Sequence, residues 1–111
     1  MPLPNDVFLI LLVLSERPRH GYGIMQHVAE RSDRQVELQT GALYRALRRM
    51  LADGLIAECA PPRDADSNDE RRRYYEVTTL GARVLAAEAE RMERLARAAR
   101  RAALGKRPRL A

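Results

Sequence analysis

Residues 39–56 read QTGALYRALRRMLADGLI, and this stretch decides the fold. Gly54 stands where a helix commonly ends in a left-handed residue, and the apolar pair after it has the character of a strand. Before Gly54, apolar side chains recur at intervals of three and four residues, which places them on one face of a helix. These side chains are Leu43, Leu47, Met50 and Leu51. The stretch therefore predicts a core-anchored helix that ends at Gly54 and leads into a strand.

The other faces of this helix carry a tyrosine and three arginines, Tyr44, Arg45, Arg48 and Arg49. A helix with an apolar inner face and a basic outer face fits the major groove of DNA. The arginines could instead form only a solvated face, and Tyr44 could be a half-buried aromatic packed against a hairpin. Arg45 and Arg48 share a face, which favours DNA contact, whereas Arg49 lies farther round and contacts phosphate or nothing. We interpret residues 39–49 as a recognition helix.

Gly41 lies in the first turn of that helix. It could be a poor helix former that is tolerated near a terminus. We favour a role in which the missing side chain lets the backbone approach a phosphate, because the first N–H groups of a helix bind anions.

The composition indicates one mainly helical domain with a polyanionic partner. The chain has 111 residues, of which 46% are hydrophobic and only 5% aromatic, so alanine and leucine supply most of the apolar mass. The net charge is +5 and the pI is about 10.1. Basic residues interleave with acidic ones, which favours double-stranded DNA over a membrane surface.

Cysteine use and the apolar runs indicate the compartment. Cys59 is the single cysteine, so no disulfide forms within the chain and a reducing compartment is expected. The apolar run 7–14 is too short to span a bilayer and lacks the features of a signal peptide. We therefore expect a cytoplasmic protein.

Patterns along the rest of the chain complete the predicted fold. A first helix is expected over 7–14, capped by Asn5 or Asp6, and a second from 20 to about 31, before the recognition helix. Strands are expected over 55–60 and 71–77. A last helix is expected from 80 to about 104, capped by Thr78 or Thr79. The two strands, joined by a polar loop, form a β-hairpin. The fold class is thus mainly α with a small β-hairpin. It divides into a winged helix-turn-helix domain over 1–78, a C-terminal dimerisation helix over 79–104 and a basic flexible tail over 105–111.

The last predicted helix carries an apolar stripe with heptad-like spacing. Its members are Leu85, Ala89, Met92, Ala96 and Ala99. A domain of this size cannot cover such a stripe, so we predict a homodimer in which the stripe meets the partner chain, together with Leu9 and Val13 of the first helix.

The second strand begins with a basic run, Arg71, Arg72 and Arg73. These arginines could neutralise the acidic loop before them, or they could contact the minor groove and flanking phosphates from the tip of a wing. Strand alternation further predicts that one of Tyr74 and Tyr75 packs on the core while the other faces outward.

The sequence offers little to catalysis or metal binding. His20, His27 and Cys59 match no standard spacing of metal ligands, so we expect a helix-start histidine, an exposed histidine and a small core residue. No nucleophile–base pair or phosphate-binding glycine loop stands out, so we predict no cofactor and no enzymatic activity.

Four blocks of sequence resemble the PadR-like family of bacterial transcriptional regulators, in order and at family-like spacing. They are His20-Gly21-Tyr22, Gly41-x-Leu43-Tyr44, Gly54-Leu55-Ile56 and Arg73-Tyr74-Tyr75-x-x-Thr78-x-x-Gly81. The resemblance covers about residues 7–85. Three positions of the recognition helix depart from the family pattern, Gln39, Ala42 and Arg45, and these bear on which operator is read.

The resemblance implies a homodimeric repressor that binds an inverted-repeat operator, with a possible small lipophilic or aromatic effector at the dimer interface. A winged-helix module that binds protein, or a nonspecific nucleoid-associated protein, are the alternatives. The predicted DNA contacts are Tyr22, Gln39, Thr40, Gly41, Tyr44, Arg45, Arg48, Arg49, Arg71, Arg72 and Arg73.

Overall fold

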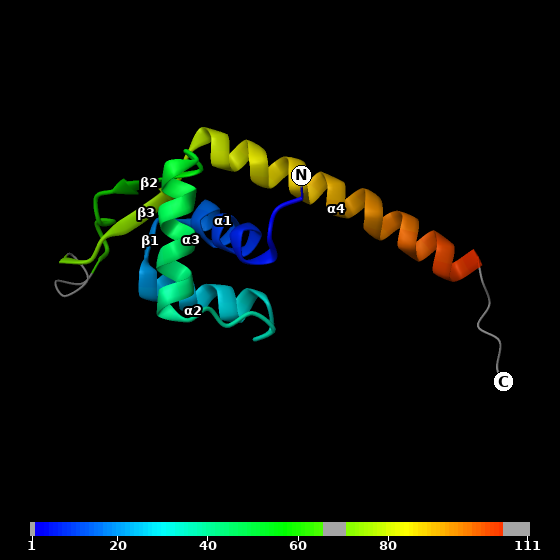
Figure 1. The fold of residues 1–111 in the computed structure, drawn as a ribbon, viewed down its shortest axis with the longest axis horizontal. Coiled ribbons are helices and arrows are strands. Elements are labelled where there is room, and N and C mark those ends of the chain that lie inside the picture. Colours follow the sequence, from blue (N-terminus) through cyan, green and yellow to red (C-terminus); the bar gives the residue numbers. More distant parts are fainter. Residues whose placement is uncertain (1, 66–70, 106–111) are drawn as a thin grey trace.

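Helices and one small antiparallel sheet build the protein in the computed structural model, which describes residues 2–65 and 71–105 (Figure 1). The elements in chain order are α1 (Asn5–Glu16), β1 (Arg19–His20), α2 (Gly21–Arg31), α3 (Thr40–Ala52), β2 (Ile56–Cys59), β3 (Tyr74–Val77) and α4 (Thr79–Gly105). The predicted fold class, mainly helical with a wing and a long last helix, is confirmed. The predicted tail lies outside the described residues, except for Gly105. None of the helices in 2–65 and 71–105 is long and apolar enough to cross a membrane.

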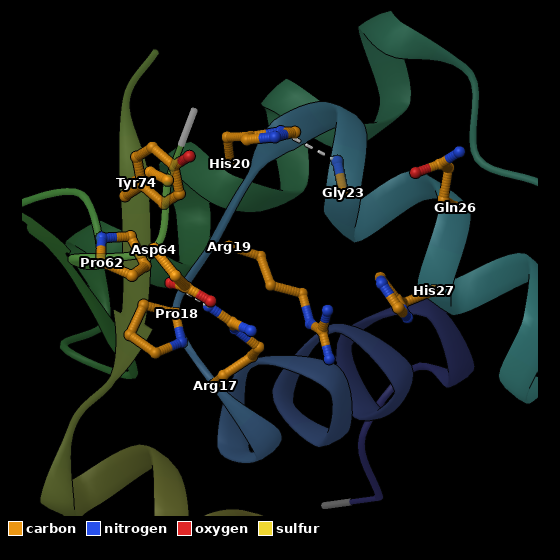
Figure 2. Close-up of a pocket in the computed structure, with 11 residues that line it drawn as sticks. Arg17, Pro18, Arg19, His20, Gly23, Gln26, His27, Pro62, Asp64 and Tyr74 are labelled. Carbon is orange, nitrogen blue, oxygen red and sulfur yellow. Dashed lines mark hydrogen bonds and ion pairs between the residues drawn. The ribbon is translucent and has the colours of Figure 1, made fainter. Parts of the chain in front are cut away.

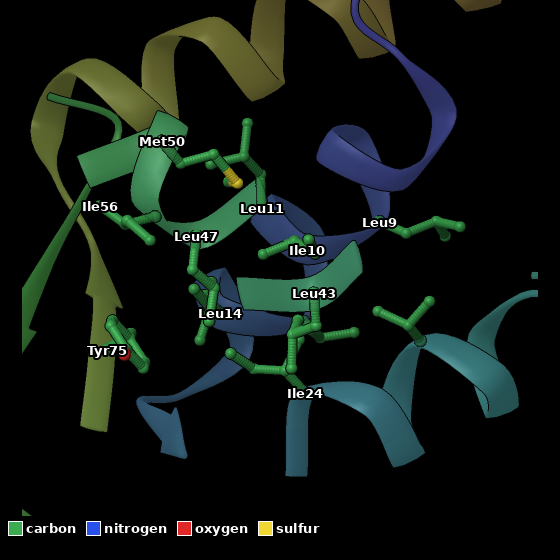
Figure 3. Packing of buried hydrophobic residues seen from close by; sticks show 12 residues of the cluster. Leu9, Ile10, Leu11, Leu14, Ile24, Leu43, Leu47, Met50, Ile56 and Tyr75 are labelled. Carbon is green, nitrogen blue, oxygen red and sulfur yellow. The ribbon is translucent and has the colours of Figure 1, made fainter. Parts of the chain in front are cut away.

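Helix α1 lies at the centre of the core, as its all-round apolar sequence predicts (Figure 3). Helices α2 and α3 and the sheet bury their apolar faces around it. Each fully buried aliphatic side chain contributes roughly 1.5–3 kcal/mol through removal from water. The buried cluster comprises Leu9, Ile10, Leu11, Val13 and Leu14 of α1, Ile24 and Val28 of α2, Leu43, Leu47 and Met50 of α3, and Ile56 and Tyr75 of the sheet.

The predicted cap of α1 is wrong. The helix begins at Asn5, its N-cap residue is Pro4, and no side chain caps it. Asp6 is therefore already inside the first turn, where its carboxylate accepts a hydrogen bond from the backbone N–H of Val7 at 2.8 Å. A negative charge at this position favours the positive end of the helix dipole, which gives the acid a role without a cap.

Helix α3 ends as its sequence predicts. Gly54 has a φ of +76°, the left-handed conformation that glycine adopts without strain. Its N–H donates to the backbone oxygen of Leu51 at 3.1 Å, and the N–H of Leu55 donates to that of Met50 at 3.0 Å. These two bonds form a Schellman motif, which satisfies the last carbonyl groups of α3 and turns the chain into β2.

The sheet has one strand more than the predicted hairpin. Its order is β1-β3-β2, with β3 antiparallel to both neighbours and the registers Arg19↔Tyr75 and Ile56↔Val77. Strand β1 has only two residues, too few for any alternation to reveal it, and it forms because β3 lies beside it. The prediction for the tyrosines of β3 is confirmed for one of them and wrong for the other. Tyr75 packs into the core cluster, but Tyr74 does not face solvent: it is only 5% exposed, because the ring of His20 lies edge-on to it at 5.3 Å.

Helix α4 starts on the turn that ends α3. Of the two predicted caps, Thr78 and Thr79, it is Thr78 that caps the helix. Its Oγ1 accepts a hydrogen bond from the N–H of Gly81 at 3.0 Å and donates one to the backbone oxygen of Gly54 at 2.6 Å. A Cβ at Gly81 would collide with the backbone oxygen of Leu55. The direction of the long helix is therefore fixed by close backbone contact with the end of α3.

Glu88 is a buried carboxylate on α4 that ties the N-terminal segment to this helix. Its Oε2 accepts a hydrogen bond from the backbone N–H of Leu3 at 3.0 Å, and Arg91 donates to both carboxylate oxygens at 2.7 and 2.9 Å. These hydrogen bonds, from Arg91 first, and the positive charge of Arg91 lower the pKa of Glu88 from 4.5 to about 2.

Replacement of Glu88 by Gln should lower the free energy of unfolding, because the amide keeps an acceptor for Leu3 but loses the charge that Arg91 binds. The folded pKa of Glu88 is depressed, so the difference from wild type should be complete above pH 4.5 and should close as the pH falls toward about 2. Urea unfolding over this pH range measures the difference. Glu90→Gln, which breaks only an exposed 3.8 Å pair with Arg94, is the matched control and should change little. A difference that persists at the acidic end would contradict the assignment.

Candidate nucleic-acid interface

The outer face of α3 is exposed as predicted. Gln39 is its N-cap residue and makes no side-chain cap bond, and Thr40 and Gly41 follow it at the surface. Tyr44 is 44% exposed. The three arginines of the same helix are exposed as well.

The three arginines of α3 differ in their surroundings. Arg49 forms an i,i+4 ion pair with Asp53 at 3.3 Å, which engages it within the helix. The guanidinium of Arg45 lies over Gly41, within 3.3 Å of where a Cβ would stand. Over the described ranges 2–65 and 71–105, neither Arg45 nor Arg48 has an ion-pair partner. Arg45 and Arg48 are therefore the α3 arginines most available to a polyanion.

The wing presents its arginines beside α2. Arg71, Arg72 and Arg73 are all exposed, and Arg73 lies 3.6 Å from the carboxylate of Glu58 on β2. The guanidinium of Arg72 lies 5.8 Å from the ring centre of Tyr22, a cation–π distance. Tyr22 itself is 57% exposed. The predicted contacts on α2 and on the wing thus form one continuous aromatic and basic surface.

The acidic loop was the competing partner for the wing arginines. Its first acid, Asp64, pairs instead with Arg17 at 2.8 Å. The remaining acids, Asp66, Asp69 and Glu70, lie outside the described residues.

His20 joins α2 to the wing. As predicted for a helix-start histidine, its Nδ1 accepts a hydrogen bond from the N–H of Gly23 at 3.0 Å and so caps α2. The same nitrogen lies 3.4 Å from Arg72, and the ring stacks near Tyr22 at 6.4 Å between centres. Sequence reasoning found the cap but missed the contact with Arg72, because that contact depends on the pairing of β1 with β3.

A polar cavity of about 270 Å³ lies on the other side of His20, between α2 and the residues that follow β2 (Figure 2). Arg17 and Asp64 form their ion pair at its wall. The Nε of Arg19 donates a hydrogen bond to the backbone oxygen of Val13 at 2.9 Å, and burial lowers the pKa of Arg19. Both arginines are thus engaged within the subunit and are poorly placed to bind DNA.

The described residues offer no evident metal or nucleophile chemistry. Within 2–65 and 71–105, no three His, Cys, Asp or Glu side chains lie close enough to hold a metal ion. Burial, and to a smaller degree the charge of Glu76, raise the pKa of the Cys59 thiol to about 11. The thiol therefore stays protonated at neutral pH, and a protonated thiol is a poor nucleophile and a poor ligand.

The predicted dimer stripe lies largely in solvent. Leu85 packs against the core, whereas Ala89, Met92, Ala96 and Ala99 are exposed. The C-terminal part of α4 projects from the body of the molecule (Figure 1). Leu95, which the stripe did not include, is 56% exposed beside them. A wider apolar face on the helical wheel would have identified it.

The two predicted interface residues of α1 lie in the subunit's own core. Val13 has 0% exposure and Leu9 has 8%. Val13 therefore has no surface to offer a partner, and its assignment to the interface is wrong. The error arose because a helix that is apolar all round does not reveal which side faces its own domain.

Replacing Arg71 and Arg72 together by Ala should weaken binding to duplex DNA of any sequence about equally. The dependence of log affinity on log salt should also flatten, by about 0.9 for each phosphate that is no longer neutralised. Titration of a fluorescent duplex at several salt concentrations measures both effects. The double variant Arg94→Ala with Arg97→Ala removes two charges from α4 and should leave the slope near that of wild type. An unchanged slope in the wing variant would show that the wing arginines do not bind phosphate.

A family model matches the larger part of the chain. Residues 10–87 match the model of the family described as transcriptional regulator PadR-like. A curated protein of Lysinibacillus sphaericus, itself uncharacterized, is 30% identical over 73 residues, which make up 66% of this chain and 64% of that protein. The chain thus spans less than two thirds of the length of that relative.

Solved structures share the fold. A PadR family transcription regulator from Clostridium difficile is 28% identical, with a TM-score of 0.74 over 88% of this chain and 97% of that chain. A PadR-like transcriptional regulator from Bacillus cereus is 22% identical, with a TM-score of 0.74 over 90% and 92% of the two chains. Both are regulators of transcription, a class of protein that is not enzymatic.

Proposed function

This chain belongs to the PadR-like family of transcriptional regulators, and from that premise we propose that it is a repressor that binds an inverted-repeat operator as a homodimer. The observation that carries the proposal is the outer face of α3. Its exposed arginines Arg45 and Arg48 have no ion-pair partner among the described residues, and they lie on a helix that the core holds from behind. In this proposal α3 enters the major groove, where arginine is the commonest reader of guanine.

The remaining predicted contacts would position the protein on the backbone of the duplex. Tyr22, Arg72 and Arg73 line a cavity together with Tyr44 of α3, and Arg71 is exposed on the same wing, so all four would meet the phosphates that flank a major groove. Gln39, Thr40 and Gly41 stand at the N-terminus of α3, whose free N–H groups suit a phosphate. Arg49 is paired with Asp53 and would contribute least.

The homodimer would form through the projecting part of α4. An apolar row on an exposed helix usually marks an interface, and Met92, Leu95 and the neighbouring alanines supply it. From α1 we now assign Phe8 and Leu12, which are half-buried, in place of the fully buried Val13. A two-fold dimer presents two recognition helices and so requires two half-sites in inverted orientation.

An effector and a compartment complete the proposal. A small lipophilic or aromatic effector would bind where the two copies of α4 meet, because that face is apolar and the DNA-facing surface is basic. A bacterial regulator that binds chromosomal DNA must be in the same compartment as the chromosome, so we propose that the protein is cytoplasmic.

Arg48→Ala is the direct test of the recognition face. A duplex that the wild-type protein selects from a random-sequence pool provides the probe. The variant should bind this duplex more weakly by about 1–3 kcal/mol, because it lacks a base contact, and should discriminate less at one base position. Arg97→Ala, which removes an exposed charge paired with Glu93 on α4, is the matched control and should bind like wild type. Wild-type affinity in the Arg48 variant would show that another face reads the DNA.

Met92→Glu tests the dimer. The change would place two like charges near a two-fold axis in an apolar setting, where an unpaired buried charge is costly. The variant should sediment as a monomer in analytical ultracentrifugation, keep its helical circular dichroism and bind the selected duplex only weakly. Arg101→Gln changes the charge by the same amount on the opposite side of α4 and should remain dimeric. A wild-type protein that is monomeric at micromolar concentration would exclude the proposed assembly.

The same measurements separate the alternative functions. A nonspecific nucleoid-associated protein would bind the selected and the random duplexes equally well. A winged-helix module that binds protein would bind neither. The basic outer face of α3 argues against the protein-binding module, because such a surface suits a polyanion.

A further inference from the structure

Gly21 is the first residue of α2, and its backbone does not require glycine. Of the glycines in the described ranges, only Gly54 has a positive φ, so an alanine at Gly21 could adopt the native backbone. Glycine also costs helix stability relative to alanine. The residue nevertheless stands buried at a helix start, so its small size has another cause.

That cause is the hydroxyl of Tyr44. A Cβ at Gly21 would stand 2.6 Å from Tyr44 Oη and 3.1 Å from Tyr44 Cζ. The first distance is shorter than van der Waals contact allows, so a methyl group here would displace the ring. Leu43, which is fully buried, closes the inner side at 3.4 Å. The hydroxyl of Tyr44 on α3 therefore lies directly against the backbone of α2 at Gly21.

The Tyr44 ring lies in the space between α3 and the wing. Tyr44 lines two adjoining cavities, and Arg73 of the wing lines both of them. On one side stand Tyr22 and Arg72, in a cavity of about 340 Å³. On the other side stands Arg48, in a cavity of about 430 Å³ floored by apolar side chains. Because the buried side is closed, a displaced ring moves toward these arginines.

We propose that Gly21 is a positioning residue for the DNA-facing surface. Because Gly21 has no side chain, the Tyr44 hydroxyl can lie against its backbone, and the ring held in this place sets the distance between α3 and the wing arginines. The inference rests on the proposed function, since it concerns binding to DNA. It also gives the Tyr44 hydroxyl a different role from base reading, because the hydroxyl points back to α2.

A double-mutant cycle tests this role. Its variants are Gly21→Ala, Tyr44→Phe and the combination of both, because the phenylalanine lacks the oxygen that the added methyl group would meet. Gly23→Ala is the matched control, since it makes the same change two residues along the same helix and its Cβ would meet His20 only at an ordinary 3.5 Å. Affinity for the selected duplex and its salt dependence are measured for each variant, together with urea unfolding.

Gly21→Ala should lower the affinity for the selected duplex by about tenfold or more, whereas Gly23→Ala should lower it by less than about threefold. The log–log salt slope of the Gly21 variant should also fall by about 0.9, because a wing arginine no longer reaches its phosphate. In the Tyr44→Phe background the same Gly21→Ala change should cost less than about threefold and should leave the slope unaltered. A purely structural role would lower stability without changing the slope of the folded protein.

Three outcomes would overturn the proposal. Gly21→Ala could bind like the Gly23→Ala control, its effect could be equal in both Tyr44 backgrounds, or the double variant could fail to fold along with the single one. The double-mutant cycle read by urea unfolding does not involve DNA, so it separates this proposal from the proposed function. If neither the wild-type protein nor any variant binds a duplex, the proposed function fails. A coupling between Gly21 and Tyr44 that appears only in unfolding would then show that Gly21 serves packing alone.

Discussion

Leu43, Leu47 and Met50 press one face of α3 into the core around α1, and the opposite face of α3 is thereby turned outward. Large-to-small changes at such sites cost about 2–5 kcal/mol, so the orientation of the helix is strongly held. A slip by one residue would rotate α3 by about 100° and would bury Tyr44 or an arginine. The burial that stabilises the fold therefore also selects which side chains can reach DNA.

The turn at Gly54 links this recognition surface to the dimer arm. The backbone oxygen of Gly54 accepts a hydrogen bond from Thr78, the cap of α4, and the backbone of Leu55 contacts Gly81. Farther along α4, Glu88 binds the N-terminal segment to the same helix. Helix α4 therefore leaves the domain at a fixed angle to α3. In a dimer joined through α4, these contacts would set the separation of the two recognition helices and hence the spacing of the half-sites.

Local signals in the sequence predicted much of this architecture, and the features they missed depend on distant parts of the chain. The period of apolar residues identified α3 and its exposed face, Gly54 marked its end, and Thr78 marked the start of α4, because each signal depends on neighbours along the chain. Strand β1, in contrast, exists only beside β3, and the burial of Tyr74 needs His20 of that strand. The contact between Gly21 and Tyr44 requires the packing of α2 on α3. No periodicity in the sequence encodes such distances.

Selection of duplexes from a random pool, followed by sequencing, is the most direct test of DNA reading by paired α3 helices. We expect wild-type protein to enrich an inverted repeat whose half-site centres are separated by about 10 base pairs or a multiple of that distance, one recognition helix for each half-site. Enrichment of a single unpaired site, or no enrichment over the starting pool, would contradict this mode of binding.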